Sequence, residues 1–228
     1  MTNSNFAQTV LDLASTFSFI LQDSDIPEEW GDTIPPEAFQ AASFIGHLVI
    51  PERITKIGKE AFAGCKMITH VIFCGKITEI GDGAFAGCSN LKCLQLKSSV
   101  TSIGSGAFYG CHKMKRLNFP VAEDYVVIND HAFFGCTSLE DVILPDKLTW
   151  LGDGSFAECE VLTKISIPSS VTMIGNFAFF KCKNLKEVRL NKKTKVSEET
   201  FVESAMCKEM ITYTQPTSRF NISNLFGR

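Results

Sequence analysis

The sequence predicts a solenoid of about eight stacked repeats, each about 23 residues long and each adding one strand to a parallel β-sheet. Three observations support this prediction. A phenylalanine recurs at intervals of 22 to 25 residues, a cysteine follows most of these three positions later, and a short run of alternating apolar residues comes next. Self-similarity at such a period is typical of repeat architectures, because one repeat cannot bury its apolar face alone. The phenylalanines are Phe39, Phe62, Phe85, Phe108, Phe133, Phe156, Phe179 and Phe201, and the cysteines are Cys65, Cys88, Cys111, Cys136, Cys159 and Cys182.

The apolar run after each cysteine predicts the strand of the repeat. Leu91, Leu94 and Leu96 show its pattern, since the last two lie two positions apart and therefore on one face of an extended chain. We interpret the phenylalanine as the main core side chain of each turn and the cysteine as a small buried hydrophobe beside it. The counterparts of this strand are Ile45/Leu48/Ile50, Ile68/Val71/Phe73, Leu139/Val142/Leu144, Leu162/Ile165/Ile167 and Leu185/Val188/Leu190.

An isoleucine-glycine pair precedes the phenylalanine in most repeats, and we expect a turn there. Asn129 replaces the glycine in the repeat that carries a two-residue insertion. Because asparagine is the commonest residue other than glycine in left-handed backbone conformations, this position is expected to require a positive φ. The glycines are Gly58, Gly81, Gly104, Gly152 and Gly175.

Nine cysteines in a chain of this size would suggest disulfides, but the number is odd and six share one repeat position. We therefore expect reduced, buried thiols, one in each coil. Cys74 and Cys93 lie outside this row.

These residues resemble the BspA-like, or Treponema-type, leucine-rich repeat family. The family pattern runs Cys-x-x-Leu-x-x-Ile-x-Leu-Pro and then Leu-x-x-Ile-Gly-x-x-Ala-Phe, and the resemblance covers residues 34–213. It implies a leucine-rich repeat solenoid of the α/β type, a curved right-handed coil with a parallel β-sheet on its concave face. It also implies binding of other macromolecules, with no catalytic residue or cofactor to carry over.

The chain divides into three parts. Residues 1–33 are expected to form an N-terminal cap, with a helix over 5–15 and an edge strand across Phe17, Phe19 and Leu21, because an open first coil would expose core. Residues 34–213 form the solenoid. Residues 214–228 are apolar enough either to fold back as a C-terminal cap or to dock on a partner.

The outward positions of the first strands predict a partner-binding patch. His47, His70 and Cys93 fall in one column, and the second column begins with Val49, Ile72 and Gln95. A solvated face would normally be polar, so these apolar residues indicate either a protein-binding surface or a surface that the N-terminal segment covers. In full, the first column is His47, His70, Cys93, Arg116, Asp141, Lys164, Glu187 and Glu209, and the second is Val49, Ile72, Gln95, Asn118, Ile143, Ser166, Arg189 and Thr212.

The two-residue insertion near residues 121–127 is a second candidate surface, because insertions in solenoids map to loops on one edge. It carries Glu123, Asp124 and Tyr125, and the tyrosine is the natural anchor for a partner.

The sequence offers little for other functions. His47 and His70 would lie side by side, but they lack a third metal ligand and a nucleophile with an orienting acid, so neither metal binding nor catalysis is expected. The basic segment 181–195 lacks interleaved aromatic residues, which argues against nucleic acid. No apolar run is long enough to cross a membrane, so membrane insertion is not expected.

These features favour a non-enzymatic protein-interaction module, a scaffold or subunit of a larger intracellular assembly with a protein partner. The N-terminus lacks the features of a signal peptide, which favours the cytoplasm. The alternative is an extracellular or cell-surface adhesin that binds a host and leaves the cell by a non-classical route. Residues 1–40 hold seven acidic and no basic residues, whereas 181–195 hold seven basic residues and one acid. Head-to-tail self-association through these ends is a further hypothesis.

Overall fold

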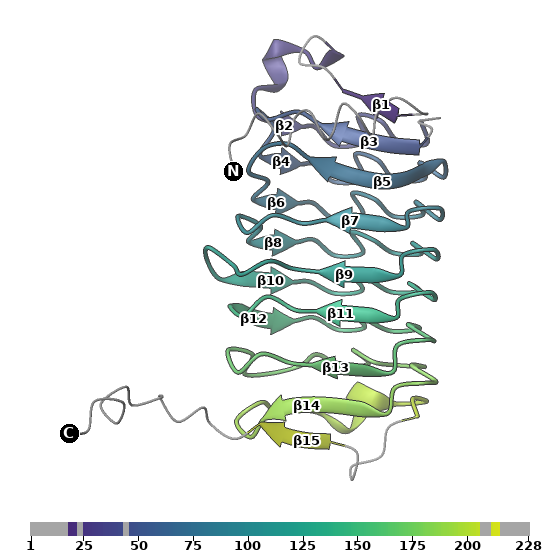
Figure 1. Ribbon diagram of the computed structural model, residues 1–228, viewed down its shortest axis with the longest axis vertical. Helices are drawn as coiled ribbons and strands as arrows, with labels where there is room; N and C mark the ends of the chain where they lie inside the picture. Colours follow the sequence, from purple (N-terminus) through teal and green to yellow (C-terminus); the bar gives the residue numbers. More distant parts are fainter. Residues whose placement is uncertain (1–17, 22–24, 43–45, 206–210, 215–228) are drawn as a thin grey trace, which may run out of the picture.

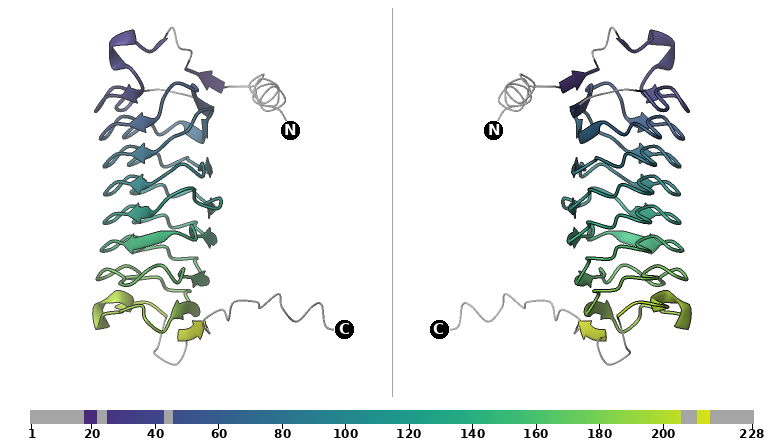
Figure 2. Two further views of the ribbon diagram at one scale, coloured as in Figure 1. Left: turned by 90° about the vertical axis from the view of Figure 1, so that its left-hand side faces the viewer. Right: turned by 90° about the vertical axis from the view of Figure 1, so that its right-hand side faces the viewer.

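The computed structural model describes residues 18–21, 25–42, 46–205 and 211–214 of the 228-residue chain. Its coils stack in one column along the long axis of the molecule, each coil lying on the one before it (Figures 1 and 2). The described residues contain no α-helix, and two short 3-10 turns, η2 (Glu28–Trp30) and η3 (Glu198–Phe201), are their only helical segments. The predicted solenoid of about eight turns is confirmed, with tight turns in place of the helices of an α/β repeat.

The predicted strands form a parallel sheet, here called sheet A, in the order β1-β3-β5-β7-β9-β11. Its first strand, β1, lies in the segment where we expected an edge strand, and it pairs with β3 so that Ser18 faces His47 and Ile20 faces Val49. Sheet A comprises β1 (Ser18–Ile20), β3 (Gly46–Ile50), β5 (Ile68–Phe73), β7 (Cys93–Gln95), β9 (Arg116–Asn118) and β11 (Asp141–Ile143). Sheet C continues the stack with β13 (Lys164–Ser166), β14 (Glu187–Asn191) and β15 (Ile211–Thr214).

A second parallel sheet, sheet B, runs along a different side of the coils (Figures 1 and 2). A simple turn was expected at each isoleucine-glycine pair, and that prediction is wrong. The isoleucine ends a short strand that pairs with its counterparts one coil before and after, as Ile57 does with Ile34 and Ile80. Sheet B comprises β2 (Thr33–Ile34), β4 (Lys56–Ile57), β6 (Glu79–Ile80), β8 (Ser102–Ile103), β10 (Val126–Ile128) and β12 (Leu148–Leu151).

The phenylalanines form one continuous stack through the core, from Phe39 to Phe201. Successive ring centroids are 5.2 to 6.0 Å apart, with interplanar angles of 3° to 13°. Trp30 closes the N-terminal end of the stack with its ring edge, 5.9 Å from Phe39. The backbone of these turns stacks in the same way, since the Phe62 N–H donates to the carbonyl of Ala84 in the next coil (2.8 Å). Each ring therefore completes its burial only when the neighbouring coils are in place.

The six repeat cysteines are reduced and fully buried, as expected. Each thiol also donates to the carbonyl oxygen of the phenylalanine one coil earlier, as Cys88 does to Phe62 (3.2 Å) and Cys182 to Phe156 (3.2 Å). The Phe62 carbonyl also accepts from the N–H of Cys65 (3.3 Å), so both of its lone pairs are used. Cysteine thus supplies both a small apolar volume and a donor for a carbonyl that is buried between coils.

The expectation of a positive φ at the repeated glycine is wrong, because neither these glycines nor Asn129 has one. Their requirement is steric. A Cβ atom at Gly58 would lie 2.6 Å from the carbonyl oxygen of Ile34, and one at Gly175 would lie 2.5 Å from the backbone nitrogen of Asp153, in each case on the preceding coil. The positive φ occurs instead just before the repeat cysteine, where Gly64 has a φ of 73°.

A stability prediction follows from Ser155, which replaces the alanine before the repeat phenylalanine. Its side chain is fully buried, and its Oγ has no hydrogen-bond partner. Because a buried unsatisfied hydroxyl costs about 1 to 3 kcal/mol, Ser155→Ala should stabilise the protein by about 1 kcal/mol in a urea titration. The matched control, Ala132→Ser, places a hydroxyl at the equivalent position one coil earlier and should destabilise. A loss of stability in Ser155→Ala would show that the hydroxyl is satisfied.

The cysteine row predicts a loss of stability in alkaline solution. Burial raises the pKa of Cys65 to about 11 and that of Cys136 and Cys182 to about 12, from 9.0. A thiol whose pKa is higher in the folded than in the unfolded state stabilises the fold. This stabilisation is complete below the unfolded pKa and is lost as the pH rises toward the folded pKa. The free energy of unfolding should therefore fall above pH 9, by about 1.4 kcal/mol per pH unit for each buried thiol.

Denaturant titrations at several pH values between 8 and 11 check this slope. Cys111→Ala removes one fully buried thiol whose pKa burial raises well above 9.0, so its slope should be smaller than that of the wild type. Cys93→Ala, at an exposed position, should keep the wild-type slope. Equal slopes for Cys111→Ala and the wild type would contradict the prediction.

Candidate protein-binding surfaces

The outer face of sheet A carries the first predicted column of side chains. Strand pairing aligns His47 with His70, His70 with Cys93, and Cys93 with Arg116. The column continues through Asp141 in sheet A, and Lys164 pairs with Glu187 in sheet C. Glu209, the last predicted member, lies outside the described residues. Strand geometry therefore produces the row that the repeat alignment predicted.

The two histidines at the start of this column are in close contact. Their ring centroids are 4.2 Å apart, with an angle of 59° between the ring planes. Thr69 Oγ1 lies 2.9 Å from Nδ1 of His70, whereas the buried Nδ1 of His47 finds no hydrogen-bond partner. Burial, with the nearby His47 and Lys92, lowers the pKa of His70 and so favours its neutral ring. The pair presents two flat, half-buried surfaces with one buried nitrogen atom unsatisfied.

The second predicted column requires one correction. Val49 is only 3% exposed, so at this position the surface is covered, the second of the two alternatives, rather than open to a partner. Strand β1 extends sheet A beyond β3, so Val49 pairs with Ile20 as well as with Ile72 and does not lie in an edge strand. Ile72 is half-buried and Gln95 is exposed. The remaining surface, called the sheet-A patch, consists of His47, His70, Ile72, Cys93 and Gln95.

The insertion loop lies on a different side of the molecule. It leads into β10 of sheet B, and the segment between β9 and β10 projects beyond its neighbours (Figure 1). Val121 and Tyr125 are 79% and 67% exposed. The structure therefore does not join the two predicted surfaces into one site.

Sheet B extends the insertion loop into an apolar surface that the sequence did not reveal. Val126 is buried, so Tyr125 and Val127 point outward from the alternating strand. Val127 pairs with the half-buried Trp150 on β12, and Met173, which is 42% exposed, precedes Ile174, the bridge partner of Leu151. We call these four residues, Tyr125, Val127, Trp150 and Met173, the apolar stripe.

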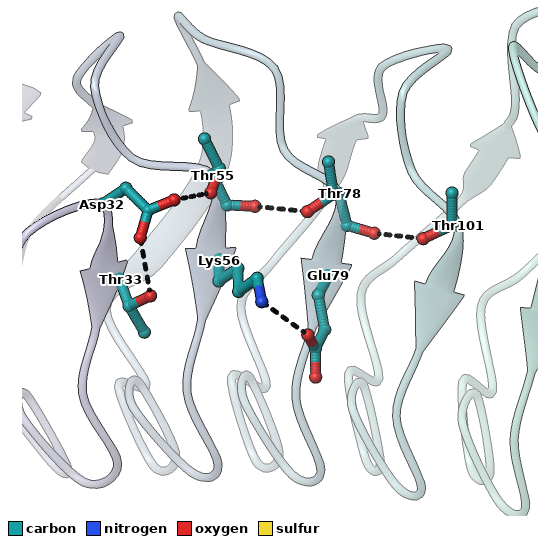
Figure 3. A network of polar contacts seen from close by, with 7 residues as sticks. All are labelled: Asp32, Thr33, Thr55, Lys56, Thr78, Glu79 and Thr101. Carbon is teal, nitrogen blue, oxygen red and sulfur yellow. Dashed lines mark hydrogen bonds and ion pairs between the residues drawn. The ribbon is translucent and has the colours of Figure 1, made fainter.

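The opposite half of sheet B is polar and satisfies its own hydrogen bonds (Figure 3). The Thr78 hydroxyl donates to the carbonyl of Thr55 (3.2 Å), and the Thr101 hydroxyl donates to that of Thr78 (3.1 Å). Asp32 begins the row by accepting from Thr55 and Thr33, and these hydrogen bonds lower the pKa of its carboxyl group. Lys56 and Glu79 form an ion pair at 3.8 Å on the outer side. Only the half beyond β8 presents the apolar stripe.

Two of the open hollows among the described residues lie along these sheets. One, of about 250 Å³, lies beside the apolar stripe and is lined by Trp150, Met173 and Lys195 together with Asp153 and Asn176. The other, of about 160 Å³, lies where sheet A gives way to sheet C, among Asp141, Lys164, Glu187 and Arg189.

The described residues offer no arrangement for metal chemistry. No group of three or more His, Cys, Asp or Glu side chains among them could hold a metal ion, and His47 and His70 gain no third ligand. In the same residues, no helix is both long enough and apolar enough to span a bilayer.

Internal ion pairs occupy part of the basic C-terminal segment. Lys181 pairs with Glu158 (3.6 Å), Lys183 with Glu160 (2.7 Å) and Arg189 with Glu187 (2.6 Å). The charge available there for the head-to-tail contact is therefore smaller than the seven basic residues suggest.

The stacked parallel strands, the phenylalanine stack and the buried cysteine row define a leucine-rich repeat solenoid, a class of protein-interaction modules. The chain belongs to the BspA type leucine-rich repeat family, which it matches in six copies over residues 32–124 and 121–225. No curated protein matches it.

Solved structures of leucine-rich repeat proteins are similar to this chain. One from Bacteroides ovatus has a TM-score of 0.64 and 26% identity, over 80% of this chain and 46% of that one. One from T. pallidum has a TM-score of 0.45 and 27% identity, over 63% of this chain and 58% of that one. The chain thus spans about half the length of these relatives.

The exposure of the cysteines predicts which thiol reacts first. Cys93 is exposed and Cys74 is half-buried, whereas the six row cysteines are inaccessible. Labelling the native protein with a maleimide at pH 7.5 should modify Cys93 fast and the row cysteines only after unfolding. Cys93→Ser should lose one fast-reacting thiol, and Cys111→Ser should lose none. Fast labelling of a row cysteine would contradict the structure.

Proposed function

We propose that this chain is a non-enzymatic protein-binding module, a scaffold or subunit of a larger intracellular assembly, and that its partner docks on the sheet-A patch. The observation that carries the proposal is the pair of half-buried rings of His47 and His70, whose centroids are 4.2 Å apart, next to the half-buried Ile72 on this face. Flat rings beside an aliphatic side chain offer a partner apolar contact area on an otherwise polar column.

The rest of the patch suits the same role. Ile72 supplies apolar contact area, while Gln95 and Cys93 are exposed at its rim. An apolar centre within a polar rim is the usual composition of a protein interface. The lowered pKa of His70 favours its neutral ring, which is cheaper to desolvate on docking than a charged one.

Affinity purification from the source cells with quantitative mass spectrometry tests this function. Ile72→Asp places a charge in the centre of the patch, and we expect it to reduce the recovery of the partner at least tenfold. Ile143→Asp is the matched control, because Ile143 occupies the same column of the same sheet, is 53% exposed, and lies three strands away.

Circular dichroism and a urea titration must show that both variants are folded. Equal recovery of the partner by Ile72→Asp and Ile143→Asp would refute the sheet-A patch as the binding site. Failure of the wild type to recover any protein from the cell extract would refute the intracellular assembly itself.

A further inference from the structure

We propose that the apolar stripe of sheet B is an interface between two copies of this chain, related by a two-fold axis that makes the two stripes antiparallel. This proposal concerns a different surface from the sheet-A patch and does not depend on the function proposed above. It rests on the order of apolar and charged side chains along sheet B.

The stripe has the composition of an interface core. Tryptophan, tyrosine and methionine are enriched where proteins associate, and here they gather on neighbouring strands beside an open hollow. Tyr125 and Met173 are 67% and 42% exposed, so both offer apolar area to a partner. The equivalent outward positions of the preceding coils are Thr33, Lys56, Glu79 and Ser102, all polar.

Charges of opposite sign lie at the two ends of the stripe. Asp124 is exposed immediately before Tyr125, and its carboxylate accepts only the neighbouring backbone N–H of Tyr125 among the contacts described (2.7 Å). The Glu123 carboxylate accepts a hydrogen bond from Ser98 and forms an ion pair with Lys76. Asp124 is therefore the carboxylate of this loop that can pair with a charge on a second copy. At the far end Lys195 is exposed, pairs through its backbone with Met173, and lines the hollow.

This order is self-complementary under a two-fold axis. Four successive coils, spaced roughly 4.8 Å apart, carry the outward residues Val127, Trp150, Met173 and Lys195. The midpoint of this row falls between Trp150 and Met173. Antiparallel pairing then places Trp150 against Met173 of the second copy, a favourable sulfur–aromatic contact. It also brings the coil that carries Val127 and Asp124 opposite the coil of Lys195 in the second copy, so opposite charges lie on facing coils, and this occurs twice because the interface is isologous. A parallel arrangement would instead oppose like charges.

The mixing of two charge-swap variants tests this geometry. Wild-type protein should show concentration-dependent dimers in sedimentation velocity between about 1 and 500 µM, as expected for weak association through a small interface. Asp124→Lys alone and Lys195→Asp alone should each weaken dimerisation at least tenfold, because each places like charges at both contacts. An equimolar mixture of the two variants should restore it, since both contacts then pair opposite charges.

Lys113→Asp is the matched control, an exposed lysine outside the stripe with the same change in net charge, and it should dimerise like the wild type. Trp150→Glu should abolish dimerisation while circular dichroism shows an intact fold. A wild type that stays monomeric over the whole series would overturn the proposal. Dimers that survive both charge swaps and Trp150→Glu would overturn it equally, because they would arise from another surface such as the ends of the solenoid.

Discussion

The stacking of each residue directly on its counterpart in the preceding coil is the constraint on which the whole structure depends. The backbone satisfies it by hydrogen bonds between coils in the sheets and again in the phenylalanine turns, as from Phe62 to Ala84. Side chains obey the same spacing. Phenylalanine rings stack at 5.2 to 6.0 Å, close to the distance of about 4.8 Å between paired strands. Identical side chains therefore pack well at this distance, which explains why the sequence repeats.

The same constraint decides where variation is tolerated. Gly58 and Gly175 lie where the backbones of adjacent coils approach most closely, so a side chain there would collide with the coil before. The two-residue insertion is accommodated because it loops outward before β10 and the strands resume their register, with Val127 opposite Ser102 and Ile128 opposite Ile103. Interior positions are thus fixed by their neighbours, while outward positions and loops are free to diverge.

This division explains how much the sequence could predict. The period and the phenylalanine and cysteine rows follow from interior positions, and the structure contains them as expected. The φ at Gly58 and the strands of sheet B were missed, and the burial of Val49 was left open, because each depends on a neighbouring segment rather than on local pattern. The strand signal of sheet B is also weak, since β4 and β6 are each two residues long. Without that sheet, Trp150 and Met173 could not be recognised as neighbours of Tyr125.

The outward residues of sheet B show why its two halves differ in their capacity to bind. The threonine row donates its hydroxyl groups to carbonyls of the preceding coil in both halves, at Thr78 and Thr101 (Figure 3) and again at Thr149, so these groups offer little to a partner. Beyond β8 the outward residues of the stripe become apolar, and burial against another surface is the one large source of stabilisation open to them. The interior of a solenoid must repeat, so its binding specificity resides in such outward columns. There, a change of a few residues converts a polar surface into an apolar one that can bind a partner.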